Sequence, residues 1–174
     1  EGASLVAARK VLSVFPQIRS ATAGHDPLET RALRVLAVSI ARSESAVQPG
    51  WSRFADLSWA EQAMREIDAK RPNDPSVQAD LGEVLSRIPT KRDEAMKLLS
   101  QLAESDLMGS PHAYAALARL RSQRGDEAGS ALALQRCVTM AGANHQSVCR
   151  EKPSPKSVAP AKADIPSTKS LTLS

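Results

Sequence analysis

Small and apolar side chains recur along this chain at helical spacing and again at a longer interval. A triplet with the spacing of one helix face occurs three times, each copy 35 residues after the last: Ala60, Met64 and Ile67; Ala95, Leu99 and Leu102; Ser130, Leu134 and Cys137. Repeats of this length are typical of stacked units, none of which can bury its apolar face alone. The pattern therefore predicts a helical repeat protein with a long surface suited to binding other proteins.

A second repeated set predicts that the helices come in pairs. Pro75, Leu81 and Gly82 recur 36 residues later as Pro111, Leu117 and Ala118. Proline is tolerated in the first turn of a helix, so both sets open a helix that precedes a triplet. The predicted pairs lie near residues 27–72, 75–104 and 111–141, and the first contains an insertion over 43–58 between helices at 27–43 and 59–70. A further N-terminal helix is predicted from the apolar stripe Leu5, Ala8, Leu12 and Phe15.

Composition agrees with an all-α domain over residues 1–149 and a disordered tail over 150–174. Hydrophobic residues make up 42% of the chain but aromatic residues only 3%, and the Ala and Leu content favours helices over sheet. The tail is rich in Pro, Ser, Lys and Ala and has too little apolar surface to offset its ordering entropy. Its last five residues, 170–174, alternate in a way that could add a strand to a partner, with a frayed terminus as the preferred interpretation.

The charge distribution excludes some functions. Of the net charge of +4, +3 falls in residues 150–174, where five Lys or Arg stand against two Asp or Glu. The helical part is therefore nearly neutral, which argues against a dedicated nucleic-acid binder. No apolar run reaches the length of about 18 residues that would predict a membrane-spanning helix.

The repeated residues resemble the tetratricopeptide repeat (TPR), a helix–turn–helix unit of about 34 residues. Leu81-Gly82 matches the Leu-Gly of its first helix, and the string from Lys70 to Pro75 matches its inter-repeat turn. The resemblance covers roughly residues 27–142, with degenerate repeats: Gln78 and Arg121 stand where large apolar side chains are usual. It implies an α-α superhelix (a TPR solenoid) of about three helical hairpins plus the N-terminal helix.

The resemblance also implies a concave wall made from one side of each first helix. Carried over by position, the predicted partner-binding residues are Arg31, Arg34, Val38, Arg42, Asp80, Glu83, Arg87, His112, Arg119 and Gln123. A wall that is basic at one end and mixed at its centre predicts a protein or peptide partner with acidic residues. The alternative is that these residues are only the solvated faces of amphipathic helices. The Lys-and-Asn clamp with which one TPR subfamily grips a C-terminal carboxylate is not matched.

Three of the five aromatic side chains fall in or beside the insertion, as Trp51, Phe54 and Trp59. Aromatic residues in a loop between helices can anchor a partner, so Trp51 and Phe54 are candidate anchors. They can equally fold back and fill a wide gap between helices. We prefer the second interpretation, because an exposed Trp-Phe pair would favour aggregation.

We find no catalytic, phosphate-binding or dinucleotide-binding motif, and we expect no enzyme activity, cofactor or metal. The paired carboxylates Asp93-Glu94 and Asp126-Glu127 open predicted helices, where negative charge complements the helix dipole. Cys137 and Cys149 leave three possibilities open: a disulfide, two free thiols, or a zinc site with His145. We favour the disulfide, which implies an oxidising compartment.

These observations predict a non-catalytic scaffold that mediates protein–protein interaction. The resemblance and the expected disulfide together suggest an exported bacterial protein, periplasmic or associated with the outer membrane. There it would help to assemble an envelope machine for secretion, pilus formation or polysaccharide export. One alternative is a docking or regulatory segment of a larger multidomain enzyme, and a cytoplasmic location is the alternative for its compartment. Self-association through the terminal helices is a third possibility.

Overall fold

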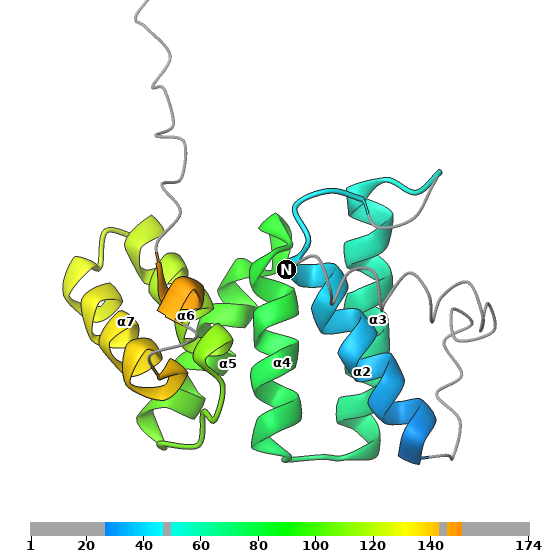
Figure 1. The fold of residues 1–174 in the computed structure, drawn as a ribbon, viewed down its shortest axis with the longest axis horizontal. Helices are drawn as coiled ribbons and strands as arrows, with labels where there is room; N and C mark the ends of the chain where they lie inside the picture. The colour runs from blue at the N-terminus through cyan, green and yellow to red at the C-terminus, as the bar shows by residue number, and fades with distance from the viewer. Residues whose placement is uncertain (1–26, 47–49, 143–145, 151–174) are drawn as a thin grey trace, which may run out of the picture.

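A computed structural model describes residues 27–46, 50–142 and 146–150. These residues form six α-helices and two short 3₁₀ helices, with no strand among them (Figure 1). The α-helices are α2 (Pro27–Arg42), α3 (Arg53–Lys70), α4 (Pro75–Ser86), α5 (Arg92–Glu104), α6 (Pro111–Gln123) and α7 (Glu127–Ala141); the 3₁₀ helices are η2 (Pro89–Lys91) and η3 (Gln146–Cys149). The all-α prediction is confirmed for this part of the chain, whereas the predicted N-terminal helix and residues 151–174 of the predicted tail lie outside the described residues.

The α-helices pack as three consecutive hairpins. α2 lies against α3, α4 against α5, and α6 against α7, and each hairpin contacts the next through α3–α4 and α5–α6 (Figure 1). The first helices of the hairpins also contact one another, α2 with α4 and α4 with α6. The arrangement is that of a helical repeat, in which α2, α4 and α6 together form one side of the molecule.

The repeated sequence positions form the apolar core between these helices. Eight of the nine triplet residues are buried, and the ninth, Leu134, is half-buried and packs against the core. Asp74, Ser110 and Asp126 cap the N-termini of α4, α6 and α7, each accepting from backbone N–H groups of the first turn. Such caps satisfy donors that have no partner within the helix. Over residues 74–141, the buried positions and the helix caps therefore lie where the sequence pattern predicts them.

Gly82 explains why α4 and α5 approach closely. A Cβ atom built on Gly82 would lie 2.6 Å from Cδ2 and 2.7 Å from Cγ of Leu99, a residue of the second triplet. No ordinary carbon–carbon contact is that short, so a side chain here would push the two helices apart or force Leu99 to move. The Leu-Gly pair is thus a packing requirement of this hairpin.

The predicted start of α3 is wrong by six residues. The helix begins at Arg53, because Ser52 caps it by accepting from the backbone N–H of Ala55 at 3.1 Å. The Arg53 guanidinium also donates to the carbonyl oxygens of Ile40 and Ala41, at 2.7 and 2.9 Å, at the end of α2. The predicted insertion over 43–58 is therefore a shorter connection followed by the first part of α3.

Candidate functional site

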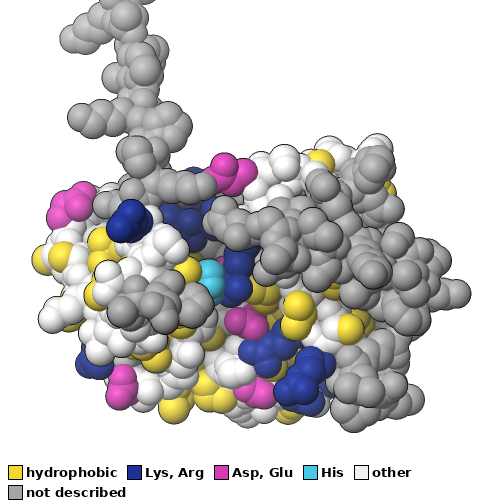
Figure 2. All heavy atoms as spheres, viewed as in Figure 1, with side chains coloured by type: hydrophobic (Ala, Val, Ile, Leu, Met, Phe, Trp, Pro, Cys, Tyr) yellow, Lys and Arg dark blue, Asp and Glu magenta, His cyan; other side chains and the backbone are white. Residues whose placement is uncertain are grey.

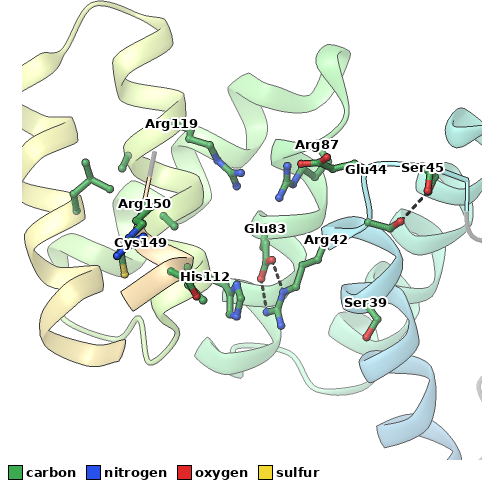
Figure 3. A pocket seen from close by; sticks show the side chains of 16 residues that line it. Ser39, Arg42, Glu44, Ser45, Glu83, Arg87, His112, Arg119, Cys149 and Arg150 are labelled. Carbon is green, nitrogen blue, oxygen red and sulfur yellow. Dashed lines mark hydrogen bonds and ion pairs between the residues drawn. The ribbon is translucent and has the colours of Figure 1, made fainter. Parts of the chain in front are cut away.

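A groove of about 540 Å³ lies between α2, α4, α6 and η3 (Figure 3). Its lining includes a histidine, His112, and six charged residues: Arg42, Glu44, Glu83, Arg87, Arg119 and Arg150. The rest of the lining comes from serines of α2 and of the following connection, from Ala115 and Ala118 of α6, from Leu134 of α7, and from residues of η3. We call this cavity the groove and use its residues as the candidate site.

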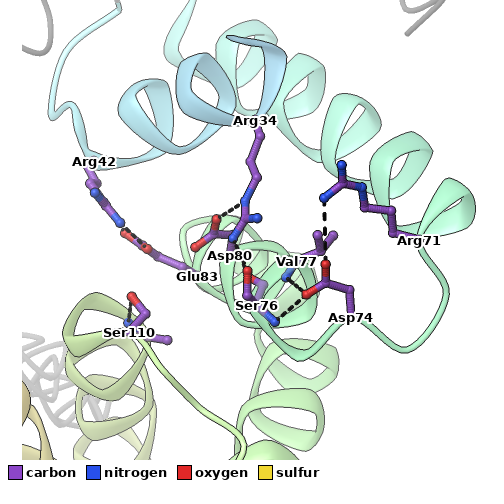
Figure 4. A network of polar contacts seen from close by, with 10 residues as sticks. Arg34, Arg42, Arg71, Asp74, Ser76, Val77, Asp80, Glu83 and Ser110 are labelled. Carbon is purple, nitrogen blue, oxygen red and sulfur yellow. Dashed lines mark hydrogen bonds and ion pairs between the residues drawn. The ribbon is translucent and has the colours of Figure 1, made fainter. Parts of the chain in front are cut away.

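On the α2 side of the groove, the arginines are held by carboxylates of α4. Arg42 donates to both carboxylate oxygens of Glu83, at 2.7 and 2.8 Å, and the Glu83 side chain is only 2% exposed (Figure 4). Three residues before Glu83 on α4, Asp80 accepts from Arg34 at 2.6 Å, and Arg34 also donates to Ser76. Burial raises the pKa of Asp80, although Arg34 opposes the shift. These ion pairs join two hairpins that are about 40 residues apart in sequence.

On the α6 side, two arginines face one another instead. Arg87, at the C-terminal end of α4, and Arg119 of α6 point toward each other across the groove (Figure 3). No ion pair joins either of them to a carboxylate within the described residues. Burial and then the charge of Arg87 lower the pKa of Arg119 to about 10, with Glu83 acting in the opposite direction. The Arg119 guanidinium therefore remains charged at neutral pH, and with Arg87 opposite, two basic side chains meet on this side of the groove.

His112 stands in the first turn of α6, between the two sides. Burial lowers the pKa of its imidazole, and the charges of Arg42, Arg119 and Arg87 lower it further, whereas Glu83 raises it. The ring is therefore neutral at pH 7, with one nitrogen able to donate and the other to accept a hydrogen bond. It gives the groove a polar contact that does not depend on charge.

A disulfide between Cys137 and Cys149 forms the wall of the groove beyond α6. Its Cα atoms are 5.7 Å apart, and it holds η3 against α6 and α7. Both sulfurs are bonded to each other, so the free-thiol alternative is wrong, and His145, the third ligand of the zinc alternative, lies outside the described residues. The disulfide places Ser147, Val148 and Arg150 on the groove. Sequence reasoning predicted the bond but did not assign these three residues to the site.

The predicted wall residues divide into three groups. Five of them line the groove: Arg42, Glu83, Arg87, His112 and Arg119. Arg34 and Asp80 form the ion pair beside it, while Arg31 and Gln123 are exposed and lie outside its lining. The prediction for Val38 is wrong, because only 6% of this residue is exposed and it belongs to the core. Ser39, the next residue of α2, lines the groove in its place.

The two candidate aromatic anchors differ. Trp51 is half-buried and packs against the core, as the gap-filling interpretation predicts, and Trp59 is buried within α3. Phe54 is 73% exposed and lies in the first turn of α3 rather than in a loop. Neither Trp51 nor Phe54 lines the groove.

The groove carries an excess of positive charge, with four arginines and two glutamates in its lining. Figure 2 shows basic side chains gathered with acidic ones and a histidine along the middle of this face. In the part of the chain that the structure describes, no group of three or more His, Cys, Asp or Glu residues could hold a metal ion. None of the described helices has the length and apolar character needed to cross a membrane.

Compared with protein-family models, curated proteins and solved structures, the chain shows no significant match to any of them. The candidate function therefore has to be argued from the groove itself.

Proposed function

We propose that the protein is a non-catalytic scaffold that binds an acidic peptide segment of a partner protein in the groove. The observation that carries this proposal is the charge of the lining, four arginines against two glutamates, in a cavity large enough for several side chains. Basic grooves attract acidic ligands and orient them through bidentate contacts of arginine with carboxylates. A concave cavity with apolar surface and a few converging charged side chains also fits a binding site better than a merely solvated helix surface.

Membership of the TPR family, with degenerate repeats, is part of the same proposal. Its support is the 35-residue repeat, the pairing of the helices and the close approach at Gly82. A superhelix of such hairpins would present α2, α4 and α6 on its concave side, where the groove lies. The family likeness adds the expectation of a peptide or protein ligand and brings no chemistry of its own.

We propose that the protein is exported and works in the bacterial envelope. The Cys137–Cys149 disulfide supports it, because disulfides persist in oxidising compartments and are rare in the cytosol. Within the envelope, the scaffold would take part in assembling a secretion, pilus or polysaccharide-export machine, the role that the resemblance suggests. The disulfide supports the compartment only, so the assembly role depends on the resemblance alone.

Binding of defined peptides to the full chain tests the proposal. Fluorescence anisotropy would compare labelled dodecapeptides rich in Asp and Glu with counterparts in which Lys replaces each acidic residue. We expect saturable binding of acidic sequences only, weakened by salt because the charges lie near the surface. Ser147→Trp should block the groove, since Ser147 is exposed and lines it, and should weaken binding about tenfold, the change that a loss of 1.4 kcal/mol produces.

The matched control is Gln101→Trp, which adds the same side chain at an exposed position of α5 outside the groove. Binding by the control should equal that of the unmodified protein. Equal loss in both variants, or equal affinity for acidic and basic peptides, would overturn the proposed function.

A further inference from the structure

We propose that Arg87 and Arg119 form an anion subsite of the groove, which binds one oxyanion, a carboxylate or a phosphate, between their guanidinium groups. This inference deepens the proposed peptide-binding function and rests on it for the identity of the whole ligand. The binding of a simple oxyanion by the two arginines is nevertheless a property of the protein alone and can be measured separately.

The first support is an unsatisfied donor. Among the described residues, Nε of Arg87 is the only buried arginine nitrogen that lacks a hydrogen-bond partner. Nearby Arg53, which is also half-buried, instead donates to two carbonyl oxygens at the end of α2. Buried polar groups are nearly always paired, and an unpaired one is costly. The protein therefore leaves the Arg87 guanidinium without a full set of partners, and because Arg87 is half-buried and lines the groove, an oxyanion would approach its exposed part from the cavity.

The second support is the arrangement of like charges. Arg87 and Arg119 come from different hairpins and point toward each other (Figure 3). The nearby carboxylate of Glu83 is already engaged by both nitrogens that Arg42 presents to it. Arg53 lies close enough to Arg87 for the two charges to repel, with Asp56 as its own counter-charge. Glu44 also lines the groove on this side and extends toward Arg87 (Figure 3). Three arginines therefore stand against the carboxylates of Glu44 and Asp56 here, and a bound anion would offset the remaining positive charge.

The third support is shape. Guanidinium is planar and offers donors in a fixed fork, which matches the two oxygens of a carboxylate or of a phosphate. Two such forks on opposite sides of one cavity can bind a single oxyanion at once. The groove of about 540 Å³ continues past them toward His112 and Ser39, so the oxyanion would belong to a larger ligand.

Titration of the full chain with simple ions tests the subsite. Sodium acetate and sodium phosphate would replace sodium chloride at constant ionic strength, and ¹H–¹⁵N spectra would follow the Nε–H signals of the arginines. We expect saturable shifts of the Arg87 and Arg119 signals with at least one ion. The ion that saturates at the lower concentration identifies the source of the oxyanion as a carboxylate or a phosphate.

Two variants and one control separate the subsite from general attraction of anions. Arg119→Gln should raise the half-saturating concentration at Arg87 at least about tenfold, since a charge-assisted hydrogen bond is lost. Arg119→Lys keeps the charge without the fork and should give an intermediate value. Arg92→Gln removes an exposed charge of α5 outside the groove and should change nothing. Shifts that do not saturate, or that persist unchanged in Arg119→Gln, would overturn the subsite and leave adventitious ions only.

The two proposals fail in different ways. If acidic peptides bind the groove but neither ion moves the Arg87 and Arg119 signals, the subsite is wrong and the proposed function stands. If the ions bind as expected but acidic peptides do not, the subsite stands and the peptide-binding function is wrong.

Discussion

The two sides of the groove use arginine in opposite ways. Between α2 and α4, Arg34 and Arg42 each reach a carboxylate of the next hairpin, and Glu83 is almost fully buried as a result. Between α4 and α6, Arg87 and Arg119 face each other with no carboxylate joined to either within the described residues. The helices that carry them are members of the same repeat. Their architecture is therefore alike on both sides, and the difference lies in the charges.

We infer from this difference that the arginines on the α2 side stabilise the fold and that those on the α6 side bind a ligand. A buried carboxylate with a bidentate partner is a fixed part of the structure, and breaking the pair leaves an uncompensated charge. Two like charges that are partly buried do not stabilise a fold and fit better with a binding role. The comparison therefore predicts that substitutions on the α2 side will act on stability and those on the α6 side on binding.

The largest effect is expected from Arg42→Ala. It leaves Glu83 buried without its partner, and the free energy of unfolding should fall by about 3 kcal/mol, the lower end for buried pairs because Arg42 itself is partly exposed. Urea denaturation followed by circular dichroism measures the change. Adding Glu83→Gln to Arg42→Ala should recover part of the loss, since the buried charge is then gone.

Arg119→Gln is the matched substitution on the other side. It removes a partly buried charge near another positive charge, so the free energy of unfolding should stay within about 1 kcal/mol of the original value or rise. Equal destabilisation by Arg42→Ala and Arg119→Gln in the same denaturation series would contradict the division between the two sides.

The α6 side is held by a covalent bond where the α2 side uses ion pairs. Reduction of Cys137–Cys149, or the double substitution Cys137→Ala and Cys149→Ala, should lower the free energy of unfolding by slightly less than 3 kcal/mol. This is the amount the chain-entropy model gives for a loop of this size. Hydrogen exchange should show the loss of protection in α7 and η3, while α2 and α4 keep theirs. Reductant should have no effect on the double variant, and a uniform loss across all helices would contradict a local role for the bond.

The sequence predicted the later hairpins well because their signals are local. Pro75 and Pro111 stand in first turns, Asp126 caps α7, and Gly125 turns the chain at a φ of 79°. The start of α3 was missed because its signals are ambiguous. Ser52 is a cap only if a helix follows, and Asp56, although charged, is fully buried.

The groove was predicted only in part because its shape depends on tertiary contacts. Positional likeness placed Arg42, Glu83 and Arg119 correctly, since a helical period carries from one repeat to the next. It also placed Val38 on the wall, where the packing of α2 buries it. The contribution of η3 could not be read from spacing, because it depends on where the disulfide brings the chain after α7. That Arg87 and Arg119 face each other required coordinates as well.

The smallest effect is expected from the pH dependence of His112, and it joins the two sides of the groove. The pKa of His112 is below the ordinary value of 6.5 in the folded protein, chiefly through burial and then through Arg42 and Arg119, with Glu83 acting in the opposite direction. The group therefore stabilises the fold fully above the unfolded pKa, and this contribution is lost as the pH falls through 6.5 toward the folded pKa. His112→Gln should remove this part of the pH dependence, measured as the free energy of unfolding between about pH 5 and pH 8. The raised pKa of Asp80 acts with the opposite sign, since its carboxyl binds protons more readily in the folded state, and His112→Gln leaves it in place.

An anion bound between Arg87 and Arg119 would add negative charge near the imidazole and raise the pKa of His112, which a ¹H titration of its ring with and without the saturating ion would detect. An upward shift that is absent in Arg119→Gln would tie the histidine to the anion subsite, whereas an unchanged pKa in the presence of the ion would place the bound charge elsewhere.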